Sequence, residues 1–538
     1  MRLRRCSWHP TGNVGVAAQL PTRALDAVRA ALQNAWRPQH HCQGGHMSEH
    51  VPERIDRRRG LLAAAAAGTV GLVGALGSSR PAEAAPQSGV SPFDGEIHDV
   101  TDHGAVGDGT ADDTGAIQAT IDAAGDGGGV FLPPGTYRVT GVLRPRKDQL
   151  IFGAAGRPVI RAAVGGSIFA VTRGAVTFHR LHLDGARSIT PEPPVPNNER
   201  LIYAAATAAV PAIDLTVTDC VVQDGWGEGI RVLGRHHAED RVIVRDTKIS
   251  NCQSFGMRMQ FTDHGHIENC DFIANRHGFS GDEVKHVTVQ GCRTIENDGH
   301  GVVFTYSQYW HVRGCRAERN GLVNSVGWGI CAGGLFRDPV PAWNRDFTIT
   351  DNVCDGNGSG GITLDPTVRQ FPEKILDQNA VISGNTCRNT TKIHGINITH
   401  CRDVIVTNNV CTDNPISGIQ VSSSSHVMVA GNICTRNRFG VNLSSNDTVE
   451  DPGHHEIGVN HLYDNVQDRN TEAFEGTYPM SGNWWHGLRG AGSPEGVVLA
   501  DPGHTYHRTD DGDGSLYVKV TGTNSATGWQ RSVVAPKP

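Results

Sequence analysis

The sequence predicts an all-β fold, a right-handed parallel β-helix, and three observations point to it. One short phrase recurs from about residue 220 onward at intervals of roughly 22–34 residues, the period range of a solenoid. Glycine accounts for 66 of the 538 residues without the three-residue period of collagen, which indicates many tight turns. No amphipathic helix separates the repeated strands, and this favours a parallel β-helix over a propeller or a leucine-rich solenoid.

Each repeat begins with a glycine that is followed by an apolar-x-apolar strand. The glycines are Gly229, Gly256, Gly278, Gly301, Gly329, Gly361, Gly395, Gly418 and Gly440. Because side chains alternate along a strand, one side of each strand faces the core and the other faces outward. If the coils lie in register, every repeat position becomes a column whose neighbours are about 4.8 Å apart.

A companion strand in the later repeats precedes an Asn-x-Cys sequence. Its asparagines are Asn352, Asn385, Asn409 and Asn432. We expect them to stack into a ladder that satisfies backbone groups at a turn. Eleven of the 13 cysteines lie between Cys220 and Cys434, most of them at one place in the repeat. We expect these cysteines to be free thiols that act as small buried hydrophobes, not disulfides.

The N-terminal region has the features of an export signal. Arg57, Arg58 and Arg59 precede Gly60 and an alanine-rich apolar run, which resembles the twin-arginine motif. We therefore expect residues 47–85 to be a signal peptide that is cleaved after Ala84 or Ala85, and residues 1–46 to be a non-native upstream extension. The mature chain is expected to be secreted without a membrane anchor, because the apolar run is short for a span. The net charge of -7 argues against nucleic acid as the main partner.

Residues 99–153 carry a series of motifs that resemble a known family. They include His103–Thr110, Asp112–Gln118, Phe131–Tyr137 and Gly153. This stretch resembles the opening of the pectate-lyase-like domain shared by polygalacturonase-type, rhamnogalacturonase-type and phage tail-spike β-helices. The resemblance, which extends over most of residues 95–465, implies an N-terminal capping helix at about residues 113–124.

The resemblance also bears on the acidic residues of this region and on the domain limits. With Asp112 or Asp113 at the N-cap of the capping helix, we interpret Asp108, Asp112 and Asp113 as structural residues. We expect the β-helix catalytic domain to occupy residues 86–470.

Residues 471–538 are expected to form a separate small β appendage. Turns at Asp511-Gly512 and Asp513-Gly514 predict β-hairpins. This segment is similar to the short β tips at the ends of tail-spike-like proteins, where three chains often meet. A homotrimer is therefore one expectation, and a simple monomeric appendage is the other.

The outward columns become chemically varied between Gly229 and Gly301. The predicted catalytic residues are Arg258, His277, Asp282 and His300. The predicted substrate-binding residues are Arg231, Glu283, Tyr306, Trp328, Asp365 and His394. Trp226 and Trp310 are expected to join Trp328 as walls on which sugars stack.

These residue types suit a secreted polysaccharide-degrading enzyme, and our leading hypothesis is a lyase that cleaves a uronic-acid-containing glycan by β-elimination. Such a reaction needs a cation beside the carboxylate, a base for the C5 proton and a donor for the leaving oxygen. Arg231 or Arg258 would supply the cation and Tyr306 the donor. His277 or His300 would be the base.

Glycoside hydrolysis is an alternative, and it needs two carboxyl groups about 5–10 Å apart. In its own column Asp282 meets another carboxylate only at Asp365, three coils away or roughly 14 Å, while Glu283 and Glu228 are less well placed partners. Residues 299–301 resemble the Gly-His-Gly segment of the polygalacturonases. The paired-aspartate and Arg-x-Lys segments of that family are not evident.

Two further alternatives stay open. Residues 275–283 are similar to coils of the mannuronan C5-epimerases, although that family has Asp-Pro-His-Glu where this chain has Ser280-Gly281-Asp282-Glu283. The chain could also be a non-catalytic glycan-binding or adhesive β-helix. No cofactor is certain from the sequence, but calcium would fit exposed carboxylates that bridge it to a substrate carboxylate.

Overall fold

The structure is a computed structural model that describes twelve stretches of the chain. These are residues 95–163, 166–192, 199–323, 327–333, 344–365, 376–444, 455–473, 488–490, 492–498, 505–508, 516–522 and 525–531. The predicted upstream extension (1–46) and signal peptide (47–85) lie outside them. Among the described residues, no helix has the length and apolar character needed to cross a bilayer.

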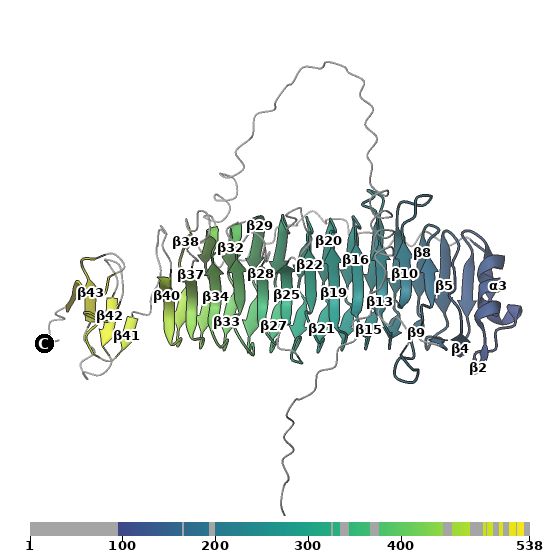
Figure 1. Ribbon diagram of the computed structural model, residues 1–538, viewed down its shortest axis with the longest axis horizontal. Helices are drawn as coiled ribbons and strands as arrows, with labels where there is room; N and C mark the ends of the chain where they lie inside the picture. Colours follow the sequence, from purple (N-terminus) through teal and green to yellow (C-terminus); the bar gives the residue numbers. More distant parts are fainter. Residues whose placement is uncertain are drawn as a thin grey trace, which may run out of the picture. The chain divides into compact units, whose positions relative to one another are not determined.

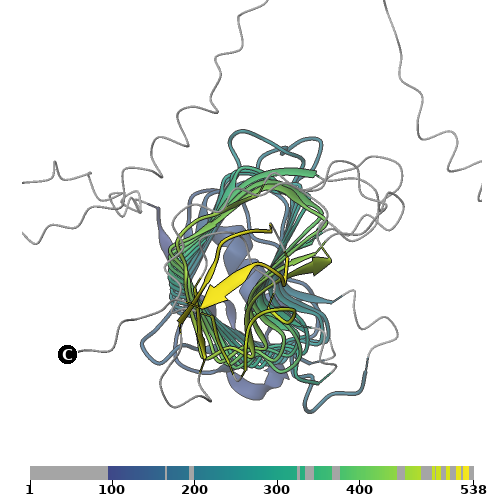
Figure 2. The same ribbon diagram turned by 90° about the vertical axis from the view of Figure 1, so that its left-hand side faces the viewer.

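Three long parallel sheets form a β-helix, because each full coil contributes one strand to each sheet (Figure 1). Sheets A and B have 14 strands each and sheet C has 12. Figure 2 looks along the axis of the β-helix and shows the strands of successive coils superposed as the walls of one tube. The fold class predicted from the sequence is therefore confirmed.

Sheet A contains β1 (Ile97–Asp99), β3 (Gly129–Leu132), β5 (Gln149–Gly153), β8 (Val176–His179), β11 (Asp214–Thr218), β14 (Arg241–Arg245), β17 (Gly265–Glu268), β20 (Val287–Gln290), β23 (His311–Arg313), β26 (Phe347–Thr350), β29 (Leu376–Ser383), β32 (Cys401–Thr407), β35 (Ser425–Ala430) and β38 (Glu456–Ile457).

Sheet B contains β2 (Asp108–Asp112), β4 (Thr136–Val139), β6 (Val159–Ala162), β9 (His182–Asp184), β12 (Val221–Gln223), β15 (Lys248–Ser250), β18 (Asp271–Ile273), β21 (Arg293–Ile295), β24 (Arg316–Glu318), β27 (Val353–Asp355), β30 (Thr386–Arg388), β33 (Val410–Thr412), β36 (Ile433–Thr435) and β39 (His461–Tyr463).

Sheet C contains β7 (Phe169–Val171), β10 (Arg200–Ala205), β13 (Glu228–Leu233), β16 (Phe255–Gln260), β19 (His277–Asp282), β22 (Val302–Thr305), β25 (Trp328–Gly333), β28 (Gly360–Asp365), β31 (Ile396–Thr399), β34 (Ser417–Ser422), β37 (Phe439–Ser444) and β40 (Gln467–Ala473). This sheet contains the nine glycine-anchored strands recognised in the sequence and extends two strands further toward the N-terminus and one further toward the C-terminus.

The N-terminal end of the tube carries a 3-10 helix, η1 (Val100–His103), and the capping helix α3 (Thr114–Ala124). Ile117 and Ile121 of α3 are fully buried in the core. Asp113 stands at the N-cap, but its carboxylate accepts the backbone N–H groups of Val106 (2.7 Å) and Gly107 (3.2 Å) instead of those of its own helix. The carboxylate of Asp112 accepts the N–H of Thr114 at 3.1 Å, so both acidic residues fix the turn that leads into the helix.

Aromatic side chains stack along the inside of the tube. Trp310 is fully buried between Phe304 and Phe347, with ring centroids 4.2 and 4.1 Å away. The prediction that Trp310 forms an external sugar-stacking wall is therefore wrong, because this ring belongs to the core. Trp226 is half-buried, and its indole N–H donates to the hydroxyl of Thr190 at 3.0 Å.

The predicted asparagine ladder exists. The Oδ1 of each buried asparagine accepts the backbone N–H and the side-chain N–H of its partner in the preceding coil, at 2.9–3.0 Å. The ladder consists of Asn352, Asn385, Asn409, Asn432 and Asn460. A second ladder joins Asn275, Asn297, Asn320 and Asn357 in the same way. These ladders satisfy turn amides that the tube would otherwise bury without partners.

All eleven cysteines between Cys220 and Cys434 are free and buried, as the sequence predicts. Eight of them occupy two positions of the coil in place of the single main one expected: the position of Asn352 holds Cys220, Cys270, Cys292 and Cys315, whereas sheet B holds Cys354, Cys387, Cys411 and Cys434. As the sequence indicates, Cys331 and Cys401 stand at other positions, and so does Cys252. Burial raises the pKa of Cys220 and of Cys252 to about 12, so these thiols stay protonated.

We expect the ten core thiols, all but the pocket-lining Cys331, to resist a maleimide reagent in the folded chain and to react fully after denaturation without reductant. Reactivity requires an accessible thiolate, and the core offers no access. Mass spectrometry of labelled peptides measures this residue by residue. A core cysteine that stays unlabelled in the denatured chain, until a reductant is added, would contradict the assignment of free thiols.

The C-terminal region contains a separate four-stranded sheet. Its strands are β41 (Leu488–Gly490), β42 (Thr505–Arg508), β43 (Leu516–Lys519) and β44 (Trp529–Arg531). The last three pair antiparallel in sequence order, whereas the two predicted Asp-Gly turns lie outside the described residues. The domain limits at residues 86, 470 and 471 and the homotrimer stay predictions.

Coil length varies mostly in the connection that leads from sheet C to sheet A. This connection spans residues 283–286 between β19 and β20. It is longer after β25, β28 and β37, where it spans residues 334–346, 366–375 and 445–455. The strands on either side of these insertions keep their register, so the inserted residues do not disturb the columns on sheet C.

Candidate active site

The register of sheet C places the sequence-predicted residues in columns. Arg231 pairs with Arg258, which pairs with Ser280. Asp282 lies between Gln260 and Thr305 in the neighbouring column. The glycine-based alignment of the sequence therefore reproduces the pairing of the strands.

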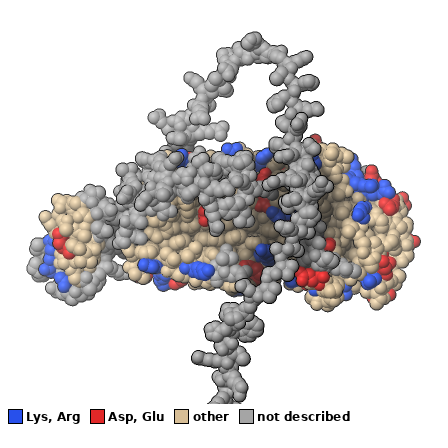
Figure 3. Space-filling view, in the orientation of Figure 1, with Lys and Arg blue, Asp and Glu red and all other residues tan. Residues whose placement is uncertain are grey.

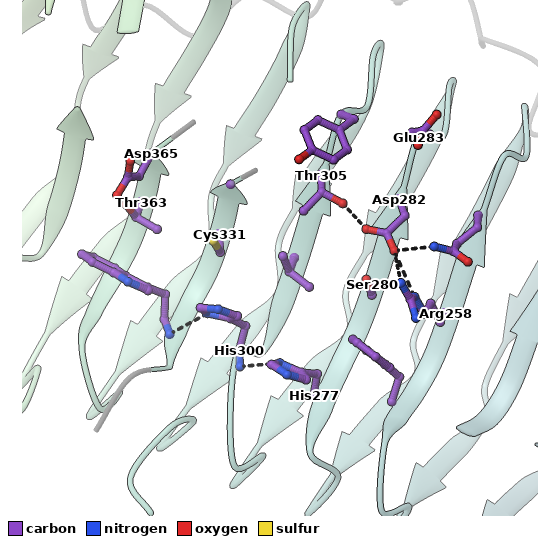
Figure 4. A pocket seen from close by; sticks show the side chains of 16 residues that line it. Arg258, His277, Ser280, Asp282, Glu283, His300, Thr305, Cys331, Thr363 and Asp365 are labelled. Atoms are coloured by element: carbon purple, nitrogen blue, oxygen red, sulfur yellow. Dashed lines mark hydrogen bonds and ion pairs between the residues drawn. The ribbon is translucent and has the colours of Figure 1, made fainter. Parts of the chain in front are cut away.

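A pocket of about 380 Å³ lies on this face and is elongated across five strands, from β16 to β28 (Figure 4). It is lined by Phe255, Arg258, Gln260, His277, Ser280, Asp282, Glu283, His300, Val303, Thr305, Tyr306, Trp328, Cys331, Gly333, Thr363 and Asp365. All four predicted catalytic residues and four of the six predicted binding residues contribute to it. Arg231 and His394 do not line the pocket.

Asp282 is the most heavily hydrogen-bonded of the predicted catalytic residues. Its Oδ2 accepts the Nε (3.0 Å) and Nη2 (2.5 Å) of Arg258 and the amide of Gln260 (2.8 Å). Its Oδ1 accepts the hydroxyl of Thr305. These contacts fix the carboxylate in one orientation, and its side chain remains 17% exposed to the pocket. The guanidinium of Arg258 also lies over the ring of Phe255, 4.8 Å from its centroid.

Arg231 belongs to a buried network behind this pair. Its Nη1 donates to Glu228 at 2.8 Å, and its Nη2 donates to Gln260. Burial lowers the pKa of Arg231 from its ordinary value, although Glu228 opposes this effect. Arg231 therefore supports the position of Gln260 and, through it, Asp282. The pocket does not use Arg231 as the exposed cation that the sequence predicts.

His277 and His300 form a stacked pair whose ring centroids are 5.5 Å apart. The Nδ1 of His277 accepts the backbone N–H of His300, and the Nδ1 of His300 accepts the N–H of Trp328, both at 3.1 Å. Burial lowers the pKa of His277 to about 3, with a further contribution from nearby cations, and lowers that of His300 to about 4. Both rings are thus neutral near pH 7. Because Nδ1 accepts, this hydrogen bonding assigns the proton to Nε2. That tautomer favours a hydrogen-bond donor over the base role expected from the sequence.

Stability is expected to decrease as the pH falls from 6.5 toward 4. His277, His300 and His394 have folded-state pKa values of about 3, 4 and 4, below the ordinary value of 6.5. In this window the unfolded chain binds more protons than the folded chain, so the free energy of unfolding rises with pH. Urea unfolding across the window measures the effect, and His300→Gln should have a shallower dependence. A midpoint that does not change over this range would contradict the assigned shifts.

The turn beyond the pocket strands is shaped by residues with left-handed backbone. Glu283 (φ 50°) and Tyr306 (φ 54°) occupy equivalent positions directly after β19 and β22. This conformation is uncommon for residues other than glycine, and it turns the chain sharply at the pocket rim. The two side chains therefore line the pocket from its edge, as expected of binding residues.

The far end of the pocket is formed by β25 and β28. A side chain at Gly360 would lie 2.2 Å from the ring of Trp328, so the glycine makes room for this indole. Figure 4 places Asp365 and Asp282 at opposite ends, with Cys331 between them. Burial, with a contribution from Asp365, raises the pKa of Cys331 to about 12, which excludes a thiolate nucleophile near neutral pH.

His394 follows Trp328 and Gly360 in the column of residues that directly precede the repeat glycines, but it lies outside the pocket lining. Its Nδ1 is buried without a hydrogen-bond partner among the described residues, and burial lowers the pKa of the ring to about 4. The described residues contain no group of three or more His, Cys, Asp or Glu side chains that could hold a metal ion. Calcium stays a prediction for the substrate-bound state.

Four residues that matter for the site were not selected from the sequence. Gln260 and Thr305 hold Asp282, while Phe255 stacks on Arg258 and, at 4.9 Å, on His277. Gln260, Thr305 and Phe255 stand in the aligned columns, so their place near Asp282 in the alignment was the signal by which the sequence could have identified them. Arg200, whose Nε donates to Glu228 at 3.3 Å, lies upstream of the region in which the repeat was recognised.

Comparisons with known proteins agree with this architecture. Residues 97–330 match the family model described as rhamnogalacturonase A/epimerase, pectate lyase-like. Residues 341–490 match the model described as periplasmic copper-binding protein (NosD). The sheet topology defines a parallel β-helix protein, and residues 97–330 are similar to the pectate-lyase-like family.

The curated relatives come from Azotobacter vinelandii. Mannuronan C5-epimerase AlgE1 is 26% identical over 274 residues, which is 50% of this chain and 16% of the relative. Alginate lyase 7 is 31% identical over 204 residues, which is 34% of this chain and 23% of the relative. The matches thus span less than a quarter of the length of either relative. The solved A-module of mannuronan C5-epimerase AlgE6 from the same organism is 19% identical with a TM-score of 0.47, over 72% of this chain and all of the module. The chain is therefore a parallel β-helix protein with a resemblance to the mannuronan C5-epimerases.

Proposed function

We propose that this protein is an enzyme that acts on a uronic-acid polysaccharide by removing the proton at C5 of a uronosyl residue. The observation that carries the proposal is the similarity to proteins named mannuronan C5-epimerase and alginate lyase. Epimerisation at C5 and β-elimination both begin with removal of this proton. The pocket on sheet C offers the groups that this step needs.

In this proposal the substrate carboxylate is held by hydrogen-bond donors of the pocket. Arg258 supplies a partly exposed positive charge, and the Nε2–H groups of His277 and His300 supply neutral donors. Neutralising the carboxylate lowers the cost of the negative charge that develops when the C5 proton leaves. These donors are in place before the substrate binds, because Asp282 and backbone amides orient them.

Asp282 is the proposed base. Three hydrogen bonds reach its Oδ2, whereas its Oδ1 accepts only the hydroxyl of Thr305 among the contacts described above. Oδ1 therefore keeps acceptor capacity for the C5 proton. Tyr306 at the rim is the proposed proton donor, either to C5 from the opposite face or to the leaving oxygen at C4.

The fate of the intermediate separates two outcomes. Reprotonation at C5 from the opposite face gives an epimer, and the relatives favour this outcome. Loss of the oxygen at C4 gives an unsaturated product, as in the lyase hypothesis. Hydrolysis receives less support, because Asp282 and Asp365 are three strands apart, about 14 Å, beyond the usual separation of a carboxyl pair.

The test is incubation of the purified chain with a panel of uronans in heavy water. Deuterium at C5, measured by proton NMR, or ultraviolet absorbance from unsaturated ends would support the proposal. New reducing ends with neither C5 exchange nor ultraviolet absorbance would replace it with a hydrolase. Binding without exchange or cleavage would replace it with a glycan-binding module. Export through the twin-arginine route remains part of the proposal and is tested by the N-terminal residue of the protein recovered outside the cell.

A further inference from the structure

The outward face of sheet C continues beyond the pocket toward the N-terminal end. Two strands, β13 and β10, extend the same columns in register: Arg200 pairs with Glu228, and Tyr203 pairs with Arg231. Figure 3 shows charged side chains grouped on part of the face that carries the sheet C strands, next to a largely uncharged stretch. The pocket described above therefore occupies only the middle of a longer row of side chains.

Three arginines gather around one buried carboxylate at this end. Glu228 is 5% exposed; its two oxygens lie 3.3 Å from Nε of Arg200, 2.8 Å from Nη1 of Arg231 and 3.8 Å from Nη1 of Arg258. Asp282 is the second carboxylate of this network through its ion pair with Arg258. The network thus contains three positive and two negative side chains, in a chain whose net charge is -7. A local positive excess on an acidic protein attracts anionic ligands to this place.

Arg200 lies on β10, on the side of Glu228 away from the pocket, and its side chain is more accessible than that of Arg231. Its side chain is 23% exposed, against 10% for Arg231. Its guanidinium lies over the ring of Tyr203, 5.1 Å from the centroid. Stacking on an aromatic ring holds the guanidinium plane in a defined orientation, which suits recognition of a carboxylate.

We propose that Arg200 and Tyr203 form a distal subsite that binds the carboxylate of a second uronosyl residue. This inference rests on the proposed function, since it places the polymer along the elongated pocket. Three strand steps separate β10 from β19. With about 4.8 Å per step, close to the length of one sugar unit in an extended chain, the bound carboxylate belongs to a sugar about three units from the reacting one.

The opposite end of the same face differs in chemistry. There the column of Tyr203 holds the uncharged residues Asn397, Gln420 and Asn442, and the column of Arg200 holds Ser417 and Phe439. The amide of Asn442 donates to Gln420 at 2.5 Å, and Asn397 donates to Thr363 at 3.1 Å. The groove therefore requires an anionic sugar on the side of β10 and does not require one on the side of β37, which gives the bound polymer a direction.

The test compares Arg200→Gln with a matched control, Arg241→Gln. Arg241 is also paired to a carboxylate, Asp214, but lies on sheet A. Binding of uronan oligomers of increasing length is measured by calorimetry, and turnover of the same oligomers is measured in parallel. Arg200→Gln should weaken binding of long oligomers roughly tenfold to a hundredfold, the loss of one charge-assisted hydrogen-bonded pair. The loss should grow with the length of the oligomer, and Arg241→Gln should leave the binding of all oligomers unchanged.

An equal loss for oligomers of every length would overturn the subsite, because Arg200 would then act on the reacting sugar. No loss at any length, or no binding of any oligomer by the unsubstituted chain, would also overturn it. The proposed function fails separately: oligomers that bind with the expected length dependence but show neither exchange at C5 nor unsaturated ends would disprove the chemistry and leave the subsite intact. A native circular dichroism spectrum for each variant establishes that folding is retained.

Discussion

Asp282→Asn is expected to reduce turnover of a uronan by roughly a hundredfold to ten-thousandfold, the range associated with loss of a general base. The substitution keeps the shape of the side chain and removes its negative charge. With its oxygen in the place of Oδ2, Asn can still accept from Arg258 and Gln260, and its amide can donate to the hydroxyl of Thr305, so the pocket should keep its form. The initial rate of C5 exchange in heavy water measures the effect.

The matched control for this experiment is Asp355→Asn. Asp355 is likewise paired with an arginine of the next coil, Arg388, at 2.9 Å, but it lies on sheet B away from the pocket. Turnover should be unchanged in this variant. Full activity in Asp282→Asn would remove Asp282 from the chemistry and leave Glu283 and Tyr306 as the candidates for the base.

Asn409→Ala is expected to lower the free energy of unfolding by about 3–5 kcal/mol, since several buried groups lose their partners at once. Oδ1 of Asn409 accepts the backbone N–H and the side-chain amide of Asn385, each at 2.9 Å. Its own amide donates to the carbonyl of Ile382 and to Asn432. Truncation leaves these groups buried and unsatisfied in the middle of the ladder. Chemical denaturation measures the change.

Asn408→Gly provides a neighbouring control. Asn408 is exposed and has a φ of 57°, a conformation that glycine adopts without strain. The change in unfolding free energy should remain below about 1 kcal/mol, the usual range for a surface substitution. Equal effects of the two substitutions would mean that the ladder contributes no more than an exposed turn residue.

The columns of sheet C could be predicted because a parallel β-helix obeys two simple periodicities. Residues alternate across each strand, and glycine marks the same place in successive coils. Aligning the glycines was therefore enough to place Arg258, Asp282 and His277 on one face, as the strand register confirms. The buried asparagines followed from the same reasoning, since a repeated polar residue inside a tube needs an identical neighbour.

The other features of the site and core depend on contacts that cannot be inferred from any single position of the sequence. Trp310 stands in a turn sequence, where strand alternation does not say which side faces the core, and its ring fills space beside Phe304 and Phe347. The tautomer of His277 depends on a backbone N–H from the next coil. Arg231 does not line the pocket because its guanidinium pairs with Glu228, which lies three residues earlier on the same face. Arg200 was missed because its coil lacks the glycine on which the alignment relied.

The insertions that follow β25, β28 and β37 all enter the coil at the same corner, directly after the column that contains Asp282 and Asp365. The chain can thus change in length and composition at this corner while the strands on either side keep their register. Evolution, or an engineer, could exchange these segments without rebuilding the columns of sheet C. Each turn of the spiral therefore combines a constant part with a part that tolerates insertion.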